Sequence, residues 1–274
     1  DIFEVGGRMQ PNFIFMQVQH EGIINEYDAT CLNNLAPLIS YSGDVRNNTD
    51  WHQGMGRAGA LTILNNDDDI ETLRLLGYKA EYLQIGFHHQ IHNPKFRFDN
   101  EKYGIVFIGN NYENMTYPLS YEREKMCVEL KNAFGDEFHV YGAGWEKIGI
   151  ESRHLDSKLS TQTYSQYKIA INHSHYKRGG YTSDRLFYIL GSGTFCLSQW
   201  YPRAEEDFSD GKHIVYFNEI SELVEKCRYW MMPENENQRK QIAKNGCDYV
   251  HSNCTWDNRV SQLIEILKKH KIVA

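Results

Sequence analysis

The stretch Tyr167–Leu197 carries residue types and spacing suited to binding an anion. It predicts a strand over Lys168–Asn172, a basic loop with two glycines, and a helix that begins at Ser183 or Asp184. Free backbone N–H groups at the start of a helix favour a phosphate, and Arg185 could hold that phosphate with two parallel hydrogen bonds. An ordinary strand–helix connection with a solvated arginine would have the same pattern.

A proton-accepting base is the second chemical group for which the chain offers candidates. Asp44 follows the apolar run Pro37–Tyr41, three residues after its end, and His20 and His88 also follow predicted strands. In the sequence Ser-Gly-Asp-Val, Asp44 could equally be a residue that forms a turn. We therefore rank Asp44 first as the catalytic base, with His20 and His88 behind it.

Two patterns that suggest a metal site have a simpler explanation. The run Asn66–Asp69 stands immediately before a helical pattern, where Asn and Asp commonly cap the helix. The histidines within 88–92 and 173–175 lack partner carboxylates at metal-ligand spacing. No G-x-S-x-G segment occurs either, which argues against a serine hydrolase. We expect no metal ligands in this chain.

Apolar runs and helical patterns alternate along the chain, and this alternation predicts an α/β fold with parallel sheets. The strands are predicted at 13–19, 37–41, 60–64, 81–85, 104–108, 137–141, 168–172, 194–198 and 213–217. Helices are predicted at 69–76, 121–134, about 183–190, 220–231 and 258–269. Polar residues follow many of these strands, at the sheet edge where α/β proteins bind ligands.

A polar segment with a proline and little periodicity, His88–Tyr103, suits a linker between two domains. We expect an N-terminal domain at 1–90, a linker at 91–103, a second domain at 104–257 and a C-terminal helix at 258–274 that packs toward the first domain. The polar strand ends of the two domains would then face each other across a cleft. About 90 residues precede the linker, fewer than the roughly 150 of a typical domain, which predicts a truncated N-terminal domain.

Composition excludes several functional classes. The chain has 274 residues, 41% of them hydrophobic, so it is globular. A formal net charge of −7 gives no general attraction to nucleic acid or to an anionic membrane. The six scattered cysteines indicate a reduced, cytoplasmic compartment, and no apolar run approaches the roughly 20 residues of a membrane span.

Ordered sequence blocks carry a family resemblance over about Asn12 to the C-terminus. The earlier blocks read FIFMQVQHEGII, ISYSGDVR, LQIGFHHQIHNP and IVFIGNNY, and the later ones SDRLFYILGSGTFCL, EEDFSDGKHIVYF, QRKQIAKNGCDYV and TWDNR. Together they resemble the CgeB-type, or spore-maturation-protein-like, group of the glycosyltransferase group 1 superfamily. The resemblance implies a GT-B fold of two Rossmann-like domains, a nucleotide-sugar donor held mainly by the second, an acceptor held by the first, and no obligatory metal.

The chain departs from the superfamily at two acidic positions. Many members carry a pair of glutamates eight residues apart, the second of which holds the donor ribose. Alignment on Gly193 and Thr194 places Gly180 and Tyr188 at those positions, so both carboxylates are missing. Loss of the pair leaves two functions open, an active transferase and a binding protein without turnover.

The resemblance and the residues together give a set of expected ligand contacts. For the donor diphosphate we expect Arg185, Ser183, Asp184, Lys177, Arg178, Gly109 and Asn110. For the nucleoside we expect Gly142, Gly144, Trp145, Tyr188 and Asn172. The expected enzyme is a cytoplasmic hexosyltransferase that needs no cofactor and favours a UDP-sugar. The expected acceptor is a hydroxyl group of a saccharide or of a surface or spore component, and less favoured is a DNA base.

Overall fold

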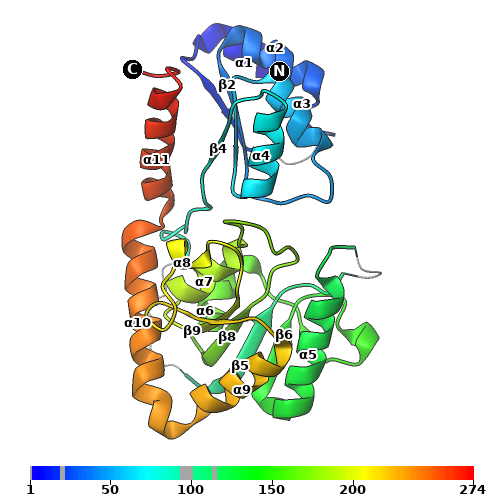
Figure 1. Cartoon of the computed structure of the whole chain (residues 1–274), viewed down its shortest axis with the longest axis vertical. Helices are drawn as coiled ribbons and strands as arrows, with labels where there is room; N and C mark the ends of the chain where they lie inside the picture. Colours follow the sequence, from blue (N-terminus) through cyan, green and yellow to red (C-terminus); the bar gives the residue numbers. More distant parts are fainter. Residues whose placement is uncertain (1, 19–21, 93–100, 113–115) are drawn as a thin grey trace. The chain divides into compact units, whose positions relative to one another are not determined.

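A computed structural model of the chain describes residues 2–18, 22–92, 101–112 and 116–274 (Figure 1). These residues form two compact units. The first unit takes Asp1–Ile85, Arg178–Tyr181 and Asp257–Ala274, and the second takes Gly86–Lys177 and Thr182–Trp256. The loop Arg178–Tyr181 thus belongs to the first unit, although its neighbours along the chain belong to the second.

The first unit holds a parallel sheet whose four described strands lie in the order β1-β2-β3-β4. These strands are β1 (Ile14–Met16), β2 (Leu38–Ser42), β3 (Leu61–Leu64) and β4 (Ala80–Tyr82). Its helices are α1 (Ile2–Met9), α2 (Glu26–Leu35), α3 (Asp50–Ala58), α4 (Asp67–Leu75) and all but the first residue of α11 (Trp256–Lys269). Buried side chains of α2 and α3, including Leu32 and Met55, pack with Leu38 of the sheet.

The second unit holds a parallel sheet whose six described strands lie in the order β10-β9-β8-β5-β6-β7. They are β5 (Tyr103–Ile108), β6 (Phe138–Tyr141), β7 (Ser152–Arg153), β8 (Tyr167–Asn172), β9 (Phe195–Gln199) and β10 (Val215–Phe217). The chain enters at β5, builds toward β7, and then returns to the other side of β5 to build from β8 to β10. Strand order therefore reverses between β5 and β8.

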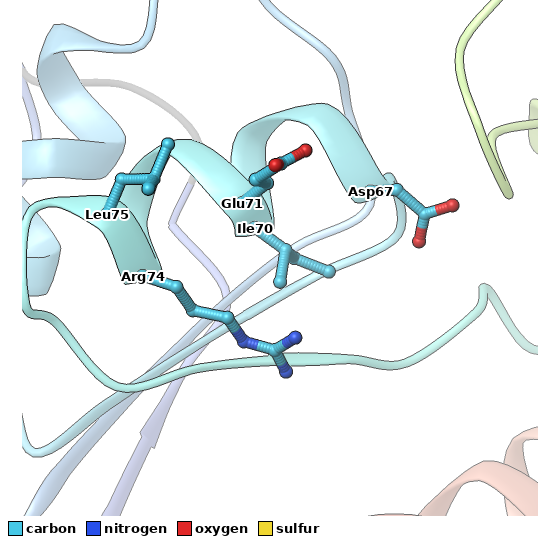
Figure 2. Close-up of a pocket in the computed structure, with 5 residues that line it drawn as sticks. All are labelled: Asp67, Ile70, Glu71, Arg74 and Leu75. Carbon is cyan, nitrogen blue, oxygen red and sulfur yellow. The ribbon is translucent and has the colours of Figure 1, made fainter.

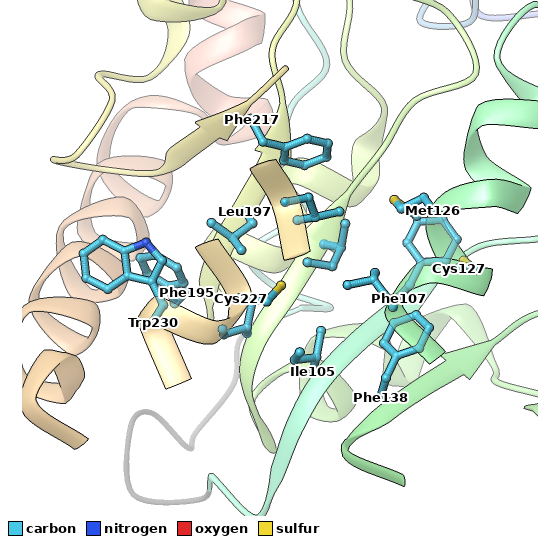
Figure 3. Packing of buried hydrophobic residues seen from close by; sticks show 14 of the residues in the cluster. Ile105, Phe107, Met126, Cys127, Phe138, Phe195, Leu197, Phe217, Cys227 and Trp230 are labelled. Atoms are coloured by element: carbon cyan, nitrogen blue, oxygen red, sulfur yellow. The ribbon is translucent and has the colours of Figure 1, made fainter. Parts of the chain in front are cut away.

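Helices α5 and α9 cover an apolar face of this second sheet. Phe107 and Phe138 point toward Met126 and Cys127 of α5, as Figure 3 shows, and Trp230 of α9 packs in the same core. The helices are α5 (Ser120–Phe134), α6 (Ser160–Tyr164), α7 (Asp184–Gly191), α8 (Ala204–Asp207), α9 (Ile220–Met231) and α10 (Glu236–Asn253). Short 3-10 turns occur at Gly135–Glu137, Glu146–Ile148, Ser157–Leu159 and Pro233–Asn235.

The α/β class and the parallel sheets predicted from the alternating pattern are confirmed. Asn66 caps α4 through a hydrogen bond from the Asp69 N–H at 3.0 Å, as the acidic run predicted. Part of the predicted linker, residues 93–100, lies outside the described residues. Within the described parts of the chain, no helix is long and apolar enough to cross a bilayer.

Candidate functional site

The carboxyl ends of β5 and β8 meet where the strand order of the second sheet reverses. The connection from β5 leads to one side of the sheet and the connection from β8 to the other, which leaves a crevice where α/β proteins bind ligands. The loop Gly109–Asn111 follows β5 and His173 follows β8. The first turns of α5 and α7 come after these strands, so both helices begin at the same edge.

Arg185, in the first turn of α7, bridges the ends of both strands. Its Nε donates to the Ile108 carbonyl at 2.6 Å and its Nη1 donates to the His173 carbonyl at 3.0 Å. Its guanidinium also lies over the Phe107 ring, 5.2 Å from the centroid. A side chain at Gly109 would begin only 2.9 Å from Nη2, so glycine there leaves room for this arginine.

Arg123, in the first turn of α5, converges on the same carbonyl from a second helix. Its Nη2 donates to the His173 oxygen at 2.6 Å, its Nη1 donates to the Asn110 carbonyl at 3.3 Å, and Nη1 also contacts Nε2 of His175. The side chain is buried, with 2% of its surface exposed. Carbonyl oxygens of Ile108, Asn110 and His173 therefore fix both guanidinium groups at the reversal point.

The histidines beside these arginines are neutral near pH 7. Burial lowers the pKa of His173 to about 4, even though the neighbouring Glu122 opposes that shift. Burial, together with the charges of Arg123 and Arg185, lowers the pKa of His175 to about 2. Positive charge at this edge consequently comes from the arginines.

Glu122 contributes a carboxylate to the edge. Its Oε1 accepts a hydrogen bond from Gln199 Nε2 at 2.8 Å and lies 3.3 Å from His173 Nε2. Contact with His173 holds the pKa of Glu122 below its ordinary value, and the charge of Lys177 acts in the same direction. The Nζ of Lys177 lies over the Trp200 ring, 5.5 Å from its centroid. The carboxylate is thus ionised and is held by its Oε1 oxygen.

A glycine-rich loop after β6 packs closely against the β5 loop. Gly142 has φ +127° and Gly144 has φ +86°, and a side chain on either would begin 2.4 Å from a backbone oxygen of the β5 loop. Asn110 Oδ1 accepts from the Ala143 N–H at 3.0 Å. Trp145 is fully buried and its Nε1 donates to the Gly109 carbonyl at 2.7 Å, so this ring supports the packing from within.

Asn172 and Tyr188, the other two residues expected to contact the nucleoside, contact other side chains of the second unit. Asn172 is buried, its Nδ2 donates to Ser198 Oγ at 2.9 Å, and its Oδ1 has no hydrogen-bond partner among the described residues. The Tyr188 ring lies 4.4 Å from that of His92 and 6.4 Å from that of Phe87. Burial raises the pKa of the Tyr188 hydroxyl, and Asp184 adds to this shift.

Near the start of α7, Ser183 is the N-cap residue, and its side chain makes no capping hydrogen bond. Its Oγ instead accepts from Arg185 Nη1 at 3.3 Å. Asp184 and Lys177 are exposed. Arg185, Ser183, Asp184 and Lys177 thus gather around one helix start in the second unit.

Arg178 lies in the first unit, where it forms ion pairs with two aspartates. Its Nη1 is 2.7 Å from Oδ1 of Asp69, a carboxylate that is only 1% exposed, and its Nε is 3.8 Å from Asp68. His52 Nδ1 lies 3.5 Å from the other oxygen of Asp69. Burial alone would raise the pKa of Asp69, but His52, the Asn66 amide and the charge of Arg178 lower it overall.

The candidate bases lie in separate surroundings. Asp44 is exposed directly after β2, and its N–H donates to Ser42 Oγ at 3.4 Å. His88 belongs to the second unit and its Nδ1 accepts from the Ile91 N–H at 3.3 Å. His20 lies outside the described residues.

The sequence pattern does not single out Glu122 and Arg123. Both lie within a helical pattern whose apolar positions, Met126, Cys127 and Leu130, account for its burial. Arg123 nevertheless occupies the same helical face, three and four residues before two of those positions. A positive charge in the first turn opposes the helix dipole. An arginine at a core-facing N-terminal position is the signal that would have pointed to it.

Two surface hollows lie elsewhere. One hollow, of about 480 Å³, lies along helix α4 and is lined by Asp67, Ile70, Glu71, Arg74 and Leu75 (Figure 2). The other, of about 290 Å³, lies by β6 and β7 and includes His139 and Arg153. No group of three or more His, Cys, Asp or Glu side chains among the described residues could hold a metal ion.

Comparison with a family model gives a match that includes Arg123, His173 and Arg185 but begins after β5. The model described as "Glycosyl transferase-like" matches residues 123–265, from α5 into α11. No curated protein sequence matches the chain.

Solved structures of similar fold include several glycosyltransferases. HepE of Anabaena, solved with UDP and glucose, has a TM-score of 0.72 and 10% identity, over 97% of this chain and 80% of that one. A glycosyltransferase from Rickettsia africae has a TM-score of 0.68 and 12% identity, over 98% and 79%. Sucrose-phosphate synthase from Thermosynechococcus elongatus has a TM-score of 0.66 and 8% identity, over 98% and 79%. The expected GT-B fold with two parallel sheets is therefore confirmed.

Proposed function

Because the chain belongs to the glycosyl transferase-like family, we propose that it transfers a sugar from a nucleotide-sugar donor to a hydroxyl group of an acceptor. We favour a UDP-sugar as the donor, since HepE, a protein of the same fold, was solved with UDP and glucose and with UDP-glucose. Within the family, the sequence blocks given above support placing the chain in the CgeB-type group.

One observation carries the proposal: Arg123 and Arg185 converge on the His173 carbonyl at the reversal point of the second sheet. The shared carbonyl oxygen fixes the positions of the two guanidinium groups. A diphosphate leaving group needs such fixed positive charge in a site that excludes bulk water. Arg185, which is half-buried, is our choice for direct contact, and the buried Arg123 adds to the positive potential.

In the proposed reaction, the bond between the anomeric carbon and the diphosphate oxygen breaks, and its electron pair stays on the diphosphate. A new bond forms from the acceptor oxygen to the anomeric carbon, and the acceptor proton passes to a base. Asp44 is our first choice for that base, supported by its exposed position after β2. His88 and His20 come after it.

The other donor contacts follow from the surroundings of Arg185. Ser183 and Asp184, at the start of α7, and Gly109 and Asn110, after β5, would place backbone N–H groups near the phosphates. Lys177 would add a mobile cation. The nucleoside would lie along the glycine-rich loop at Gly142 and Gly144 and near Asn172. Charge from arginine is sufficient for this role, so we propose that the reaction needs no cofactor.

For the acceptor we propose a saccharide or a surface or spore component, with a DNA base less favoured given the net charge of −7. We also propose a cytoplasmic location, supported by six free cysteines, five of them buried.

A second function, nucleotide-sugar binding without turnover, is favoured by a specific observation. Where the superfamily resemblance expects a ribose-binding glutamate, Tyr188 packs against His92 and Phe87. A phenol in that packing cannot supply the two hydrogen bonds of a carboxylate.

Calorimetry with UDP, GDP and ADP, followed by an assay of nucleotide release from UDP-glucose with a panel of saccharides, tests both functions. Transfer requires binding and acceptor-dependent release of UDP. Binding without release supports the second function, and no binding to any of the three nucleotides would contradict both.

A further inference from the structure

Glu122 presents one carboxylate oxygen that the protein leaves unused. Its Oε1 takes the hydrogen bond from Gln199 and the contact with His173. Oε2 has no hydrogen-bond partner among the described residues, and the side chain is 37% exposed. A carboxylate that is held by one oxygen and lies in a partly exposed side chain can accept hydrogen bonds from a ligand through its other oxygen.

His173 fixes this carboxylate beside the cations. Its carbonyl oxygen accepts from both Arg123 and Arg185, while its fully buried ring contacts Glu122. Gln199, at the end of β9, holds the same oxygen from the neighbouring strand. Groups bound to a diphosphate at Arg185 would therefore lie within reach of Glu122.

The chemistry of the carboxylate narrows what it can bind. Hydrogen bonding lowers the pKa of Glu122, so the group is ionised near pH 7 and accepts rather than donates protons. The guanidinium groups and Lys177 nearby disfavour a further cation. Neutral hydroxyl groups remain, and two adjacent hydroxyls can both donate to one carboxylate.

We propose that Glu122 binds a vicinal diol of the nucleotide-sugar donor, taking the part of the carboxylates that are absent at Gly180 and Tyr188. The inference rests on the proposed function, since it needs a nucleotide sugar in the second unit. The diol is either the ribose 2′,3′-diol or a pair of hydroxyls on the transferred sugar.

The test is calorimetry of the full chain and of Glu122→Gln with UDP, 2′-deoxy-UDP, UDP-glucose and UDP-2-deoxyglucose. Loss of hydrogen bonds to a charged acceptor should weaken binding roughly 10- to 100-fold in the variant. Ribose binding predicts that the wild type prefers UDP over 2′-deoxy-UDP by a similar factor and that the variant does not. If Glu122 binds the transferred sugar, the variant should lose affinity for UDP-glucose but not for UDP. The wild type should then prefer UDP-glucose to UDP-2-deoxyglucose if the C2 hydroxyl takes part.

Glu129→Gln, an exposed position on the same helix, is the matched control and should bind like the wild type. If Glu122→Gln does not fold, Glu122→Asp replaces it. This variant keeps the charge but has a side chain that is one methylene shorter, so it should show the same loss of binding affinity. Affinities of a folded Glu122 variant equal to those of the wild type for both UDP and UDP-glucose overturn the diol site alone. A wild-type chain that binds neither ligand overturns the proposed function with it.

Discussion

Arg178, in the connection from β8 to α7, and Arg185, in the first turn of α7, lie seven residues apart but have different partners. Arg178 belongs to the first unit and pairs with the buried carboxylate of Asp69 at 2.7 Å. Arg185 belongs to the second unit and donates to the carbonyls of Ile108 and His173. A carboxylate cancels the charge of its partner, whereas a carbonyl only orients it. The hydrogen-bond partners of an arginine, rather than its exposure or its place in the sequence, therefore decide whether its charge is available to an anion.

The same contrast holds for the wider surroundings of the two arginines. In the first unit, Asp69 is shared by Arg178, His52 and Asn66, which makes a charge-balanced structural cluster. In the second unit, Arg123 and Arg185 both donate hydrogen bonds to the carbonyl oxygen of His173. We therefore assign ligand binding to the second cluster and stability to the first, and each assignment can be broken by substitution.

The largest effect is expected at Asp44, the exposed carboxylate after β2 that we propose as the base. Asp44→Asn should lower turnover by about 10² to 10⁴ and leave nucleotide affinity nearly unchanged, because the base acts on the acceptor. Steady-state transfer rates and calorimetry with UDP measure the two quantities. Asp50→Asn, also exposed, is the control. Unchanged transfer rates in the Asp44 variant would move the base to His88 or His20.

Next in size is the stability of the first unit. Asp69→Asn removes the carboxylate that compensates Arg178 and should lower the free energy of unfolding by about 3 kcal/mol. Asp68→Asn, whose carboxylate is 57% exposed and 3.8 Å from the same arginine, should cost less than about 1 kcal/mol. Urea unfolding followed by circular dichroism compares the variants. Equal losses in both would mean that burial of Asp69 does not make its ion pair structural.

How far the sequence predicts this fold can be judged from particular elements. Helix α9 was predicted with its observed bounds, Ile220–Met231, because its apolar residues are regularly spaced. Helix α10 was not predicted, since it is polar and contains Gly246 near its middle. A side chain at Gly246 would begin 2.4 Å from the His213 carbonyl, so the glycine allows close packing and does not interrupt the helix. Local propensity cannot reveal such a tertiary contact.

In the candidate site too, a local sequence pattern predicts some residues, while others depend on contacts between distant parts of the chain. Arg185 follows from the pattern of a strand, a basic loop and a helix start, which is local along the chain. The pairing of Arg178 with Asp69 joins residues 109 positions apart and no local pattern contains it. Glu122 and Arg123 were missed for a related reason, because their contacts with His173 form across two strand–helix connections.

The arginines can be compared directly by measuring affinity. Arg185→Ala should weaken binding of UDP by about 1.5 to 3 kcal/mol, the value of a charge-assisted hydrogen bond. Arg185→Gln, which keeps N–H donors but removes the charge, should show most of that loss. Arg178→Ala should leave affinity unchanged, because the charge of Arg178 is already paired. Calorimetry on the three variants decides the matter, and an equal loss in Arg178→Ala would end the distinction between the two residues.

The last expected effect is a difference in the acid response of the two units. The folded pKa of His173, about 4, lies below its ordinary value of 6.5, so the unfolded chain takes up a proton that the folded unit refuses. Burial of the neutral His173 ring therefore lowers stability as the pH falls from about 6.5 to about 4, by about 2 kcal/mol at pH 5.

Asp69 acts in a different pH range. Its pKa is lowered from 3.8, so its contribution is present above that value and is lost only as the pH falls below it, through the folded pKa. His173→Gln should flatten the urea-unfolding profile of the second unit between pH 6.5 and 4. It should not change the loss that Asp69 gives the first unit below pH 4, and the exposed His154→Gln serves as control. If the profile of His173→Gln keeps the wild-type slope in that window, His173 is not the neutral buried group that holds Glu122 and the two arginines together. The acid response would then have to be sought in another group of the second unit.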